Sequence, residues 1–556
     1  MTMTDKPNIL LIYADQHRPD WLGCADGFPH RIPAGTPNLD RIAARGVRFT
    51  NAVCPSPLCA PSRACLASGC EYHNNGGALA NNDCYPMSIK SLYSGLQDAG
   101  YHTMTSGKLD LTKGLDIPYV PHTVKPSHGK PGMTELGFSD MLEVIGKWSG
   151  RYDSDPFPID PYELFLQERG LFTSHIEDTR RRKGIGSRCE TSPTPLPDEA
   201  YRDNWVADRA LAMLRDAPDD KPWFLQLNLD NPHSPNDITQ RMADACRNRE
   251  IPGPREARGL EIPYETHLKL RQNYTAQVEN NDRLVGLMLA ELKRRGELEN
   301  TLVVYTADHG EMLGDFGAFE KCQWRWPSAQ VPMIVSGPDI VRGTVYSGPA
   351  TNLDLAATFL DYAGVTGTQD TDSRSMRDLI EGKTAGHREY VYSGLTDNCQ
   401  SHMRWRMVYD GRFKLVRDDT TGTLSLYDQA EDPWEEKDVA ENHRAVFDRL
   451  SAYLPEESPV TPEPYVIVNP DPVEPGRHVV HAGATGNAVR PVRRIELHCE
   501  GERVAFRDGN MLIWHTTTLG RGKRRLKVVA NGSFEKEFEF DSCESRSCSA
   551  RGALSG

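Results

Sequence analysis

The sequence has no run of apolar residues that reaches the roughly 18 residues needed for a transmembrane helix. Its N-terminus, MTMTDKPNILLIYAD, also lacks the basic start and the small-residue cleavage site of a signal peptide, so its short apolar run is interpreted as a first strand. Together these two absences predict a cytoplasmic protein with no membrane partner.

Positive charge is scarce as well. Lysine and arginine number 64 against 78 acidic residues, and the formal net charge is -14. Nucleic-acid binding requires a basic face, so no nucleic-acid partner is expected. An anionic substrate would need positive side chains gathered locally against this acidic background.

No C-x-x-C pair occurs among the 13 cysteines, which argues against a zinc knuckle. An odd, scattered set of cysteines in a reducing compartment is expected to remain as free thiols. One stretch nevertheless stands out: PSPLCAPSRACLASG, residues 55–69, holds Cys59 and Cys65 on a small-residue background. For Cys59, the residues alone leave open a disulfide, a metal site, a reactive thiol or a modified side chain.

The chain does contain short apolar runs rich in Val, Ile and Leu. They are continuous rather than alternating, which is typical of strands buried on both faces of a parallel sheet. The runs lie at residues 8–15, 223–233, 301–311 and 331–337. With 556 residues, the chain is long enough for two or three domains.

Helical periodicity separates these runs. The apolar faces are predicted at Val206, Ala210, Met213 and Leu214 in residues 198–217, and at Leu284, Leu287, Met288 and Leu292 in residues 275–297. Alternation of strands and helices predicts an α/β fold with a mostly parallel central sheet flanked by helices.

Polar residues follow the ends of the predicted strands. They are Asp15 and Gln16 after the first run, His233 after the second, and Asp308 and His309 after the third. Ligands of open α/β sheets bind beyond the carboxyl ends of the strands. Two carboxylates, an imidazole and an amide at that edge can hold a divalent cation, although any one of them alone is more often a helix cap or a satisfied polar group.

The composition changes after residue 454. We expect a catalytic domain over 1–455 with a smaller C-terminal subdomain at about 385–455, a Pro- and acid-rich linker at 456–478, an immunoglobulin-like β module at 479–541 and a flexible tail at 542–556. The module is interpreted as a structural or oligomer-forming addition.

The stretch CAPSR, Cys59 to Arg63, resembles the C-x-P-S-R signature of type I sulfatases, which belong to the alkaline-phosphatase-like hydrolases. The resemblance covers about Pro7 to Asn442, and its segments occur in the family's order. They are PNILLIYADQ, GTPNLDRIAARGVRFTNAV, GKLD, PHSP, VVYTADHGEMLGDFG, TNLDLAATFLDYAG and LYDQAEDPWEEKDVAEN. It implies an alkaline-phosphatase-like core and a sulfuric ester hydrolase of the arylsulfatase kind.

The resemblance also implies that Cys59 is oxidised to formylglycine by a maturation enzyme. The hydrated aldehyde is a geminal diol, in which one hydroxyl can attack sulfur and the other can expel sulfate by collapse to the aldehyde. One divalent cation, Mn²⁺ or Ca²⁺, would be held by residue 59 together with the strand-end residues Asp15, Gln16, Asp308 and His309.

Positive side chains would complete the catalytic set. The resemblance implies that Lys108, Lys321 and Arg63 offset charge on the sulfuryl oxygens, and that Arg63 orients the modified side chain. His233, with Lys321, would lie near the leaving oxygen as general acid or as electrostatic support. Each lysine taken singly is more often a solvated surface charge.

Three further positions are candidates for binding substrate oxygens, and spacing does not choose among them: Asn75, Asn81 and Asn82. Asp110 is a fourth candidate. It stands where the family's G-K-x-H element has histidine, and a carboxylate there would repel an anion unless it is protonated, turned away or paired with a lysine such as Lys113.

Two residue pairs in the segments expected to bind the metal differ from those of many sulfatases. The pairs Asp15–Gln16 and Asp308–His309 resemble those of choline sulfatases and phosphonate monoester hydrolases, and the imidazole favours manganese over calcium. The leading hypothesis is a hydrolase of small-molecule sulfate monoesters, expected as a homo-oligomer, a dimer or a tetramer. The alternatives are a phosphonate monoester or phosphodiester hydrolase with promiscuous sulfatase activity, and a non-catalytic binder of sulfated ligands if Cys59 is unmodified.

Overall fold

The structure is a computed structural model of the 556-residue chain. It describes residues 6–26, 28, 32, 34–81, 83–111, 136–147, 158, 160–185, 190–256, 262–365, 371–396, 403–454, 462–470, 478–486, 492–516, 519 and 522–542. No helix within these ranges combines the length and the apolar character needed to cross a bilayer.

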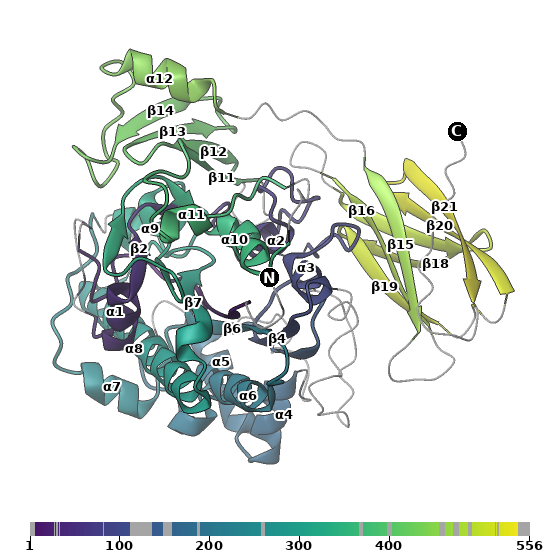
Figure 1. The fold of residues 1–556 in the computed structure, drawn as a ribbon, viewed down its shortest axis with the longest axis horizontal. Helices are drawn as coiled ribbons and strands as arrows, with labels where there is room; N and C mark the ends of the chain where they lie inside the picture. The colour runs from purple at the N-terminus through teal and green to yellow at the C-terminus, as the bar shows by residue number, and fades with distance from the viewer. Residues whose placement is uncertain are drawn as a thin grey trace.

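An eight-stranded sheet forms the centre of the catalytic part (Figure 1), in the order β5-β4-β6-β1-β7-β8-β2-β9. Its strands are β1 (Asn8–Asp15), β2 (Gly46–Phe49), β4 (His102–Gly107), β5 (Asp140–Glu143), β6 (Trp223–Pro232), β7 (Thr301–Ala307), β8 (Met333–Ser336) and β9 (Thr344–Tyr346). A separate parallel pair joins β3 (Ala52–Val53) to β10 (Ala350–Thr351). The predicted α/β fold with a mostly parallel central sheet is confirmed.

Helices cover the two faces of this sheet (Figure 1). One group packs around α8 and the other around α10. The first comprises α1 (Pro37–Ala44), α6 (Arg202–Asp216) and α8 (Tyr264–Arg295), and the second α2 (Cys59–Ser68), α3 (Leu92–Asp98) and α10 (Leu355–Tyr362). The remaining helices are α4 (Pro161–Glu168), α5 (Phe172–Ile185), α7 (Gln240–Cys246), α9 (Trp326–Ala329), α11 (Arg377–Ile380) and α12 (Arg444–Ser451), with 3₁₀ turns at Asp198–Ala200, Leu298–Asn300, Asp315–Gly317 and Asn352–Asp354.

Four neighbouring strands of the sheet run parallel and bring their carboxyl ends to one edge. β1 lies between β6 and β7, and β4 pairs with β6, all in parallel. Every residue of β1, β6 and β7 is buried, because helices cover both faces, and this explains their continuous apolar sequences. The polar residues that follow these strands are therefore gathered at one place.

Three details of the secondary structure differ from the sequence prediction. The run at 331–337 forms β8, which is antiparallel to β7, so its end lies away from the other strand ends. Leu287 is 42 % exposed, because the buried face of α8 is centred on Val285 and Met288 instead. Helix α8 also begins at Tyr264 rather than at 275, since inward-facing residues of its first turns, such as His267, are polar and carry no apolar period.

Beyond the central sheet, a four-stranded antiparallel sheet and α12 form the smaller subdomain expected near 385–455. Its strands are β11 (Val391–Leu395), β12 (Trp405–Tyr409), β13 (Phe413–Asp418) and β14 (Leu424–Asp428). Lys414 of β13 and Glu435 form an ion pair with fully buried side chains, and the Glu435 carboxylate accepts a hydrogen bond from the backbone of Trp326 in α9. This pair ties the subdomain to the catalytic core.

Two antiparallel sheets follow and form what we call the C-terminal module. One has the order β15-β16-β19 and the other β18-β17-β20-β21. The strands are β15 (Glu463–Pro470), β16 (His478–Thr485), β17 (Arg494–Cys499), β18 (Glu502–Asp508), β19 (Met511–Thr516), β20 (Gly522–Ala530) and β21 (Phe534–Ser542).

The predicted linker at 456–478 is wrong in its extent, because β15 lies inside it and pairs with β16. The sequence PYVIV within that acidic, proline-rich stretch places Tyr465, Val466 and Val468 in buried positions. Composition averaged over the whole stretch concealed this strand. Of the predicted tail at 542–556, only Ser542 falls within the described residues, as the last residue of β21.

Candidate active site

Cys59 is the first residue of α2, a helix whose residues are all buried. Extended backbone at Leu58 precedes it, and the helix ends at Gly69, whose φ of 70° is the left-handed conformation that glycine adopts without strain. The small residues of CAPSRACLAS allow this helix to pack closely inside the protein. Cys59 thus lies at the positive end of a helix dipole, in the protein interior.

Four side chains converge on one point at the strand edge. Asp15, Cys59, Asp308 and His309 each offer a ligand atom, and these atoms lie within 4.8 Å of one another. The Cys59 Sγ is 3.2 Å from Nε2 of His309 and 3.9 Å from Oδ1 of Asp15. All four residues are buried, and the mixture of carboxylates, an imidazole and a sulfur fits a divalent cation. These are four of the five residues that the sequence analysis named as candidate metal ligands, and the fifth is Gln16.

Arg63, one turn after Cys59 in α2, holds the two aspartates. Its Nε donates to Oδ2 of Asp308 at 2.9 Å, and its Nη2 lies 3.4 Å from Oδ2 of Asp15. Its Nη1 also donates to the backbone carbonyl of Lys108 at 2.5 Å. The guanidinium therefore orients the two carboxylates. Its expected role in orienting the side chain of residue 59 stays a prediction.

Lys108 and Asp110 follow strand β4. The Lys108 ammonium forms an ion pair with Asp15 and lies 3.4 Å from Oδ2 of Asp110. Both residues are almost fully buried. Of the alternatives for Asp110, the structure shows pairing with a lysine. The partner is Lys108, whereas Lys113 lies outside the described residues.

His233 and Lys321 form a contact pair on the other side of the cluster. The Lys321 Nζ lies 2.6 Å from Nε2 of His233 and donates to Oε1 of Gln16 at 3.0 Å. The amide nitrogen of Gln16 donates to Glu311, and its backbone N–H donates to Oδ1 of Asp308 at 3.0 Å. Gln16 thus connects this pair to the metal-ligand candidates.

The electrostatics of the cluster favour charged side chains despite burial. Burial alone would raise the pKa of both Asp15 and Cys59, but Lys108 and the neighbouring cations hold both pKa values well below their usual ranges. Burial would likewise lower the pKa of Lys321, but the charges at Cys59 and Asp15 raise it. Burial and the adjacent ammonium lower the pKa of His233, so its imidazole is neutral.

The three candidate asparagines differ in their surroundings. Asn75 donates to the carbonyl of Ala78 and to Cys65 Sγ, and its Oδ1 accepts from the N–H of Gly77. These contacts engage its amide inside the protein, which corrects the prediction that Asn75 binds substrate. Asn81 accepts a hydrogen bond from the backbone N–H of Ala60, 3.4 Å away, and so lies beside Cys59. Asn82 lies outside the described residues.

A second ionic group, which we call the Arg18 cluster, lies behind the metal loop. It comprises Arg18, Asp20, Arg271 and Asp315, each at most 3 % exposed. Arg18 donates two hydrogen bonds of 2.9 Å to Asp20 and one of 2.6 Å to Asp315. It also donates to the carbonyls of residues 311 and 312, at 3.3 Å each, and so fixes the backbone of the loop that begins at Asp308.

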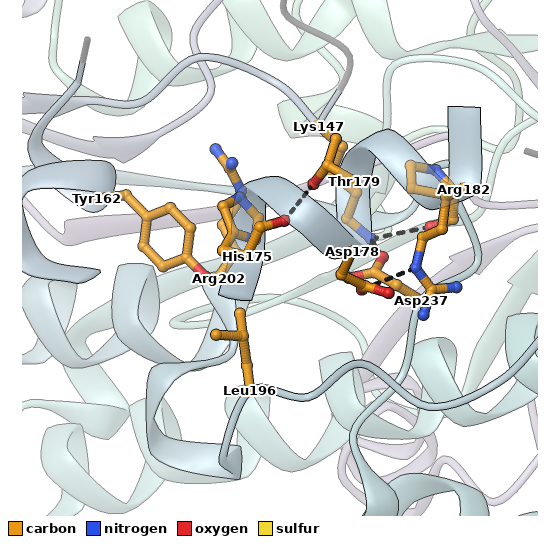
Figure 2. A pocket seen from close by; sticks show the side chains of 10 residues that line it. Lys147, Tyr162, His175, Asp178, Thr179, Arg182, Leu196, Arg202 and Asp237 are labelled. Carbon is orange, nitrogen blue, oxygen red and sulfur yellow. Dashed lines mark hydrogen bonds and ion pairs between the residues drawn. The ribbon is translucent and has the colours of Figure 1, made fainter. Parts of the chain in front are cut away.

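A small cavity lies beside the segment that carries His233 (Figure 2). Figure 2 shows Lys147, Arg182 and Arg202 around it, together with Asp178 and Asp237. Lys147 donates to Oδ1 of Asn231 and to Oδ1 of Asp237, both at 2.9 Å, and to the carbonyl of His233 at 3.3 Å. This buried lysine therefore holds the His233 segment in place.

Lys147 and the Arg18 cluster were missed by the sequence analysis. Arg18 stands only three residues after Asp15, and its proximity to a metal-ligand candidate was a signal that could have been used. Lys147 carries no such signal, because it follows the end of β5 by four residues in a stretch without a motif. Its role depends on contacts with residues far away in the sequence.

Comparison with known proteins agrees with this arrangement. An arylsulfatase of Clostridium perfringens is 26% identical over 413 residues, 70% of this chain and 81% of that protein. A choline-sulfatase of Rhizobium meliloti is 27% identical over 478 residues, 81% of this chain and 85% of that protein. The solved phosphonate monoester hydrolase of Agrobacterium radiobacter has the same fold, with a TM-score of 0.64 at 22% identity, over 81% of this chain and 94% of that one.

Two protein families match the sequence. The family described as N-sulphoglucosamine sulphohydrolase, C-terminal, matches residues 314–458. The sulfatase family matches residues 7–365, more than half of the chain and every residue of the converging cluster. The resemblance found in the motifs is thereby confirmed, and this chain belongs to the sulfatase family.

Proposed function

We propose that the protein is a metal-dependent hydrolase that cleaves small-molecule sulfate monoesters, with residue 59 as a formylglycine nucleophile. The observation that carries this proposal is the convergence of Asp15, Cys59, Asp308 and His309 within 4.8 Å in a member of the sulfatase family. A binder of sulfated ligands would need positive charge, but it would not need a thiol aligned with three metal-ligating groups.

A divalent cation would be held by Asp15, Asp308 and His309, with residue 59 and Gln16 as further ligands. The donors fit such an ion, because two carboxylates, an imidazole and a sulfur atom, all buried and within 4.8 Å of one another, are groups that divalent cations accept as ligands. The imidazole favours Mn²⁺ over Ca²⁺, and both accept the carboxylate ligands. When bound, the cation lowers the pKa of a coordinated hydroxyl and stabilises negative charge.

Maturation of Cys59 to formylglycine requires a separate modifying enzyme. The formylglycine would supply a geminal diol, with one hydroxyl to attack sulfur and a second to release sulfate. Cys59 is distinguished from the neighbouring thiols by its surroundings: burial raises the pKa of Cys54 and of Cys65 well above the usual range, whereas the cations around Cys59 lower its pKa.

The protein's own side chains would bind and orient the sulfate group. The ammonium groups of Lys108 and Lys321 are both buried beside residue 59, where hydrogen bonds to sulfuryl oxygens are strong because water is largely excluded. The low pKa of His233 and the raised pKa of Lys321 favour electrostatic support of the leaving oxygen, through a hydrogen bond from the Lys321 Nζ. His233 would orient that ammonium by accepting from it.

A phosphonate monoester or phosphodiester hydrolase is the second candidate. The observation that favours it is the Asp308–His309 pair, in which the imidazole lies in the ligand cluster. A singly charged tetrahedral anion suits both reactions, so we expect some activity on each. We further propose a cytoplasmic homo-oligomer, either a dimer or a tetramer.

Two measurements on protein purified from its native host test the proposal. Mass spectrometry of the peptide that contains Cys59 should show the mass loss of conversion from thiol to aldehyde. The ratio of kcat/KM for an aryl sulfate and for the matching aryl phosphonate monoester should exceed one. A ratio below one would select the second candidate, and an unmodified, inactive protein would select the ligand binder.

A further inference from the structure

One loop of the catalytic core, residues 75–87, contacts both the surroundings of Cys59 and the C-terminal module. We propose that the C-terminal module is a positioning element of the active site, and that Asn510 holds this loop in its catalytic conformation. The inference rests on the proposed function for its effect on catalysis. Its structural basis is independent of that function.

On the module side, Asn510 makes the central contact. Its amide donates to the carbonyl of Cys84 at 2.8 Å, and its Oδ1 accepts from the N–H of the same residue at 3.0 Å. Asn510 is 1 % exposed and Cys84 is fully buried, so neither backbone group has water as an alternative partner. Removing the amide would break both of these hydrogen bonds to buried backbone groups, which is costly.

Further contacts surround this pair. The hydroxyl of Tyr465 accepts a hydrogen bond from the N–H of Met87 at 3.3 Å, and the N–H of Gly486 donates to the carbonyl of Gly76 at 3.1 Å. Tyr465 and Met511 form a small apolar cluster with Cys84. The module therefore contacts the loop near both of its ends and at Cys84.

On the catalytic side, the same loop reaches two parts of the active site. The N–H of Tyr85, the residue after Cys84, donates to the carbonyl of Leu111 at 2.8 Å, next to Asp110. Asn81 accepts from the N–H of Ala60, next to Cys59. Cys84, which Asn510 holds, therefore lies in the sequence between Asn81, which contacts helix α2, and Tyr85, which contacts the segment that follows Lys108.

Hydrogen bonds within the loop connect the residues on either side of residue 82, and through them a displacement can pass along the loop. The Asp83 carboxylate accepts from the N–H groups of Leu79 and Ala80, at 3.0 and 2.8 Å. Gly76 and Gly77 have φ values of 77° and 99°, which favour glycine at the bend where the loop begins. A shift at Cys84 would therefore move Asn81 as well, rather than being absorbed between them.

The module has a hydrophobic core of its own. Its core is a separate cluster that includes Val480, Ile495 and Val528, apart from the core of the catalytic part. Both family matches end by residue 458, before the module begins. We therefore expect changes at Asn510 to alter catalysis more than folding.

The test compares Asn510→Ala with Asn531→Ala in the full-length, matured protein. Asn531 serves as a control inside the module, because its Oδ1 also accepts two backbone hydrogen bonds, from Arg493 and Arg494, and its φ of 51° makes Asn531→Ala a test of disturbing the module alone. Amide hydrogen exchange of residues 79–87 is measured together with kcat and KM for 4-nitrophenyl sulfate. Asn510→Ala should speed exchange and lower kcat by roughly ten- to a hundredfold, because small misplacements of catalytic groups are costly.

Asn510→Asp keeps the acceptor but places a carboxylate oxygen against the buried Cys84 carbonyl, so it should be at least as impaired as Asn510→Ala. Asn531→Ala should match the parent in kcat and in exchange of the loop. The proposal is overturned if exchange of 79–87 does not change in Asn510→Ala, if it rises without a fall in kcat, or if Asn531→Ala lowers kcat equally. If the parent does not hydrolyse the sulfate, the proposed function fails, and the exchange comparison alone then decides whether Asn510 holds the loop.

Discussion

The loop that begins at Asp308 separates two buried ionic groups that use charge differently. In the Arg18 cluster, each guanidinium faces a carboxylate, and Asp20 accepts two parallel hydrogen bonds from one arginine. At the active site, the ligand atoms of Asp15, Asp308 and His309 point towards a common centre instead. In the first group the charges pair with one another, whereas the second is arranged as a set of candidate ligands for one cation. We expect the Arg–Asp pairs to stabilise the folded protein, and the converging side chains to serve catalysis.

The largest effect should follow loss of the nucleophile. Cys59→Ala is expected to lower kcat on an aryl sulfate by at least about a thousandfold, because the residual rate then comes only from binding and electrostatics. Unfolding in urea should change little, since the substitution removes one sulfur atom. Cys65→Ala is the matched control, as it removes another buried thiol of α2. Equal turnover by Cys59→Ala and the parent would refute the proposed chemistry.

The Arg18 cluster should show the opposite pattern. Asp315→Asn leaves Arg18 and Arg271 without their shared carboxylate, and breaking a buried pair of this kind typically costs about 3–5 kcal/mol. The free energy of unfolding in urea should fall by about that amount, while Asp361→Asn, which weakens the partly exposed pair with Arg377, should cost at most about 1 kcal/mol. A loss of stability no larger than that of the control would contradict the interpretation that Asp315 stabilises the protein by pairing with Arg18 and Arg271.

Glu71 is a buried carboxyl group that belongs to neither of the two ionic groups. Neither oxygen of Glu71 has a hydrogen-bond partner among the described residues, and burial raises its pKa to about 8. The proton it keeps in the folded state stabilises the protein at acid pH, and this contribution is lost as the pH rises from about 4.5 to about 8.

Glu71→Gln should therefore unfold less readily than the parent at pH 9, by roughly 1–3 kcal/mol, and differ little from it at pH 5. Urea unfolding at both values measures this, with the exposed Glu441→Gln as control. Equal pH dependence in the parent and Glu71→Gln would show that Glu71 is ionised and paired in the folded protein.

The smallest effect is expected at Lys147, which acts on the site only through the backbone of His233. Lys147→Met should lower kcat by about tenfold, through misplacement of His233 and its partner Lys321, and leave KM nearly unchanged. Lys147→Arg should restore part of the loss, and Lys221→Met, an exposed lysine, serves as control. A rise in KM at constant kcat would mean that the cavity contributes to substrate binding instead.

Much of the central fold was predictable because strands that are buried on both faces require continuous apolar sequences. β1, β6 and β7 are covered on both faces, and their continuous apolar runs reflect this. The direction of β8 was not predictable in the same way, since an apolar run is the same whether a strand is parallel or antiparallel. β15 was missed because its proline- and acid-rich surroundings outweighed five residues of strand sequence.

The amino-acid sequence by itself indicated the CAPSR motif, the polar residues that follow β1 and β7, and the meeting of those residues at one edge of the sheet. Such residues are set by chemistry that tolerates few substitutes, and they follow strands whose ends must meet at one edge. Only the tertiary structure decided that Asp110 pairs with Lys108, that Asn75 belongs to its own loop, and that Asn510 contacts Cys84. Those roles depend on distances between atoms that are far apart in the sequence. A hydrogen bond between such atoms produces no periodic pattern of residues from which it could be predicted.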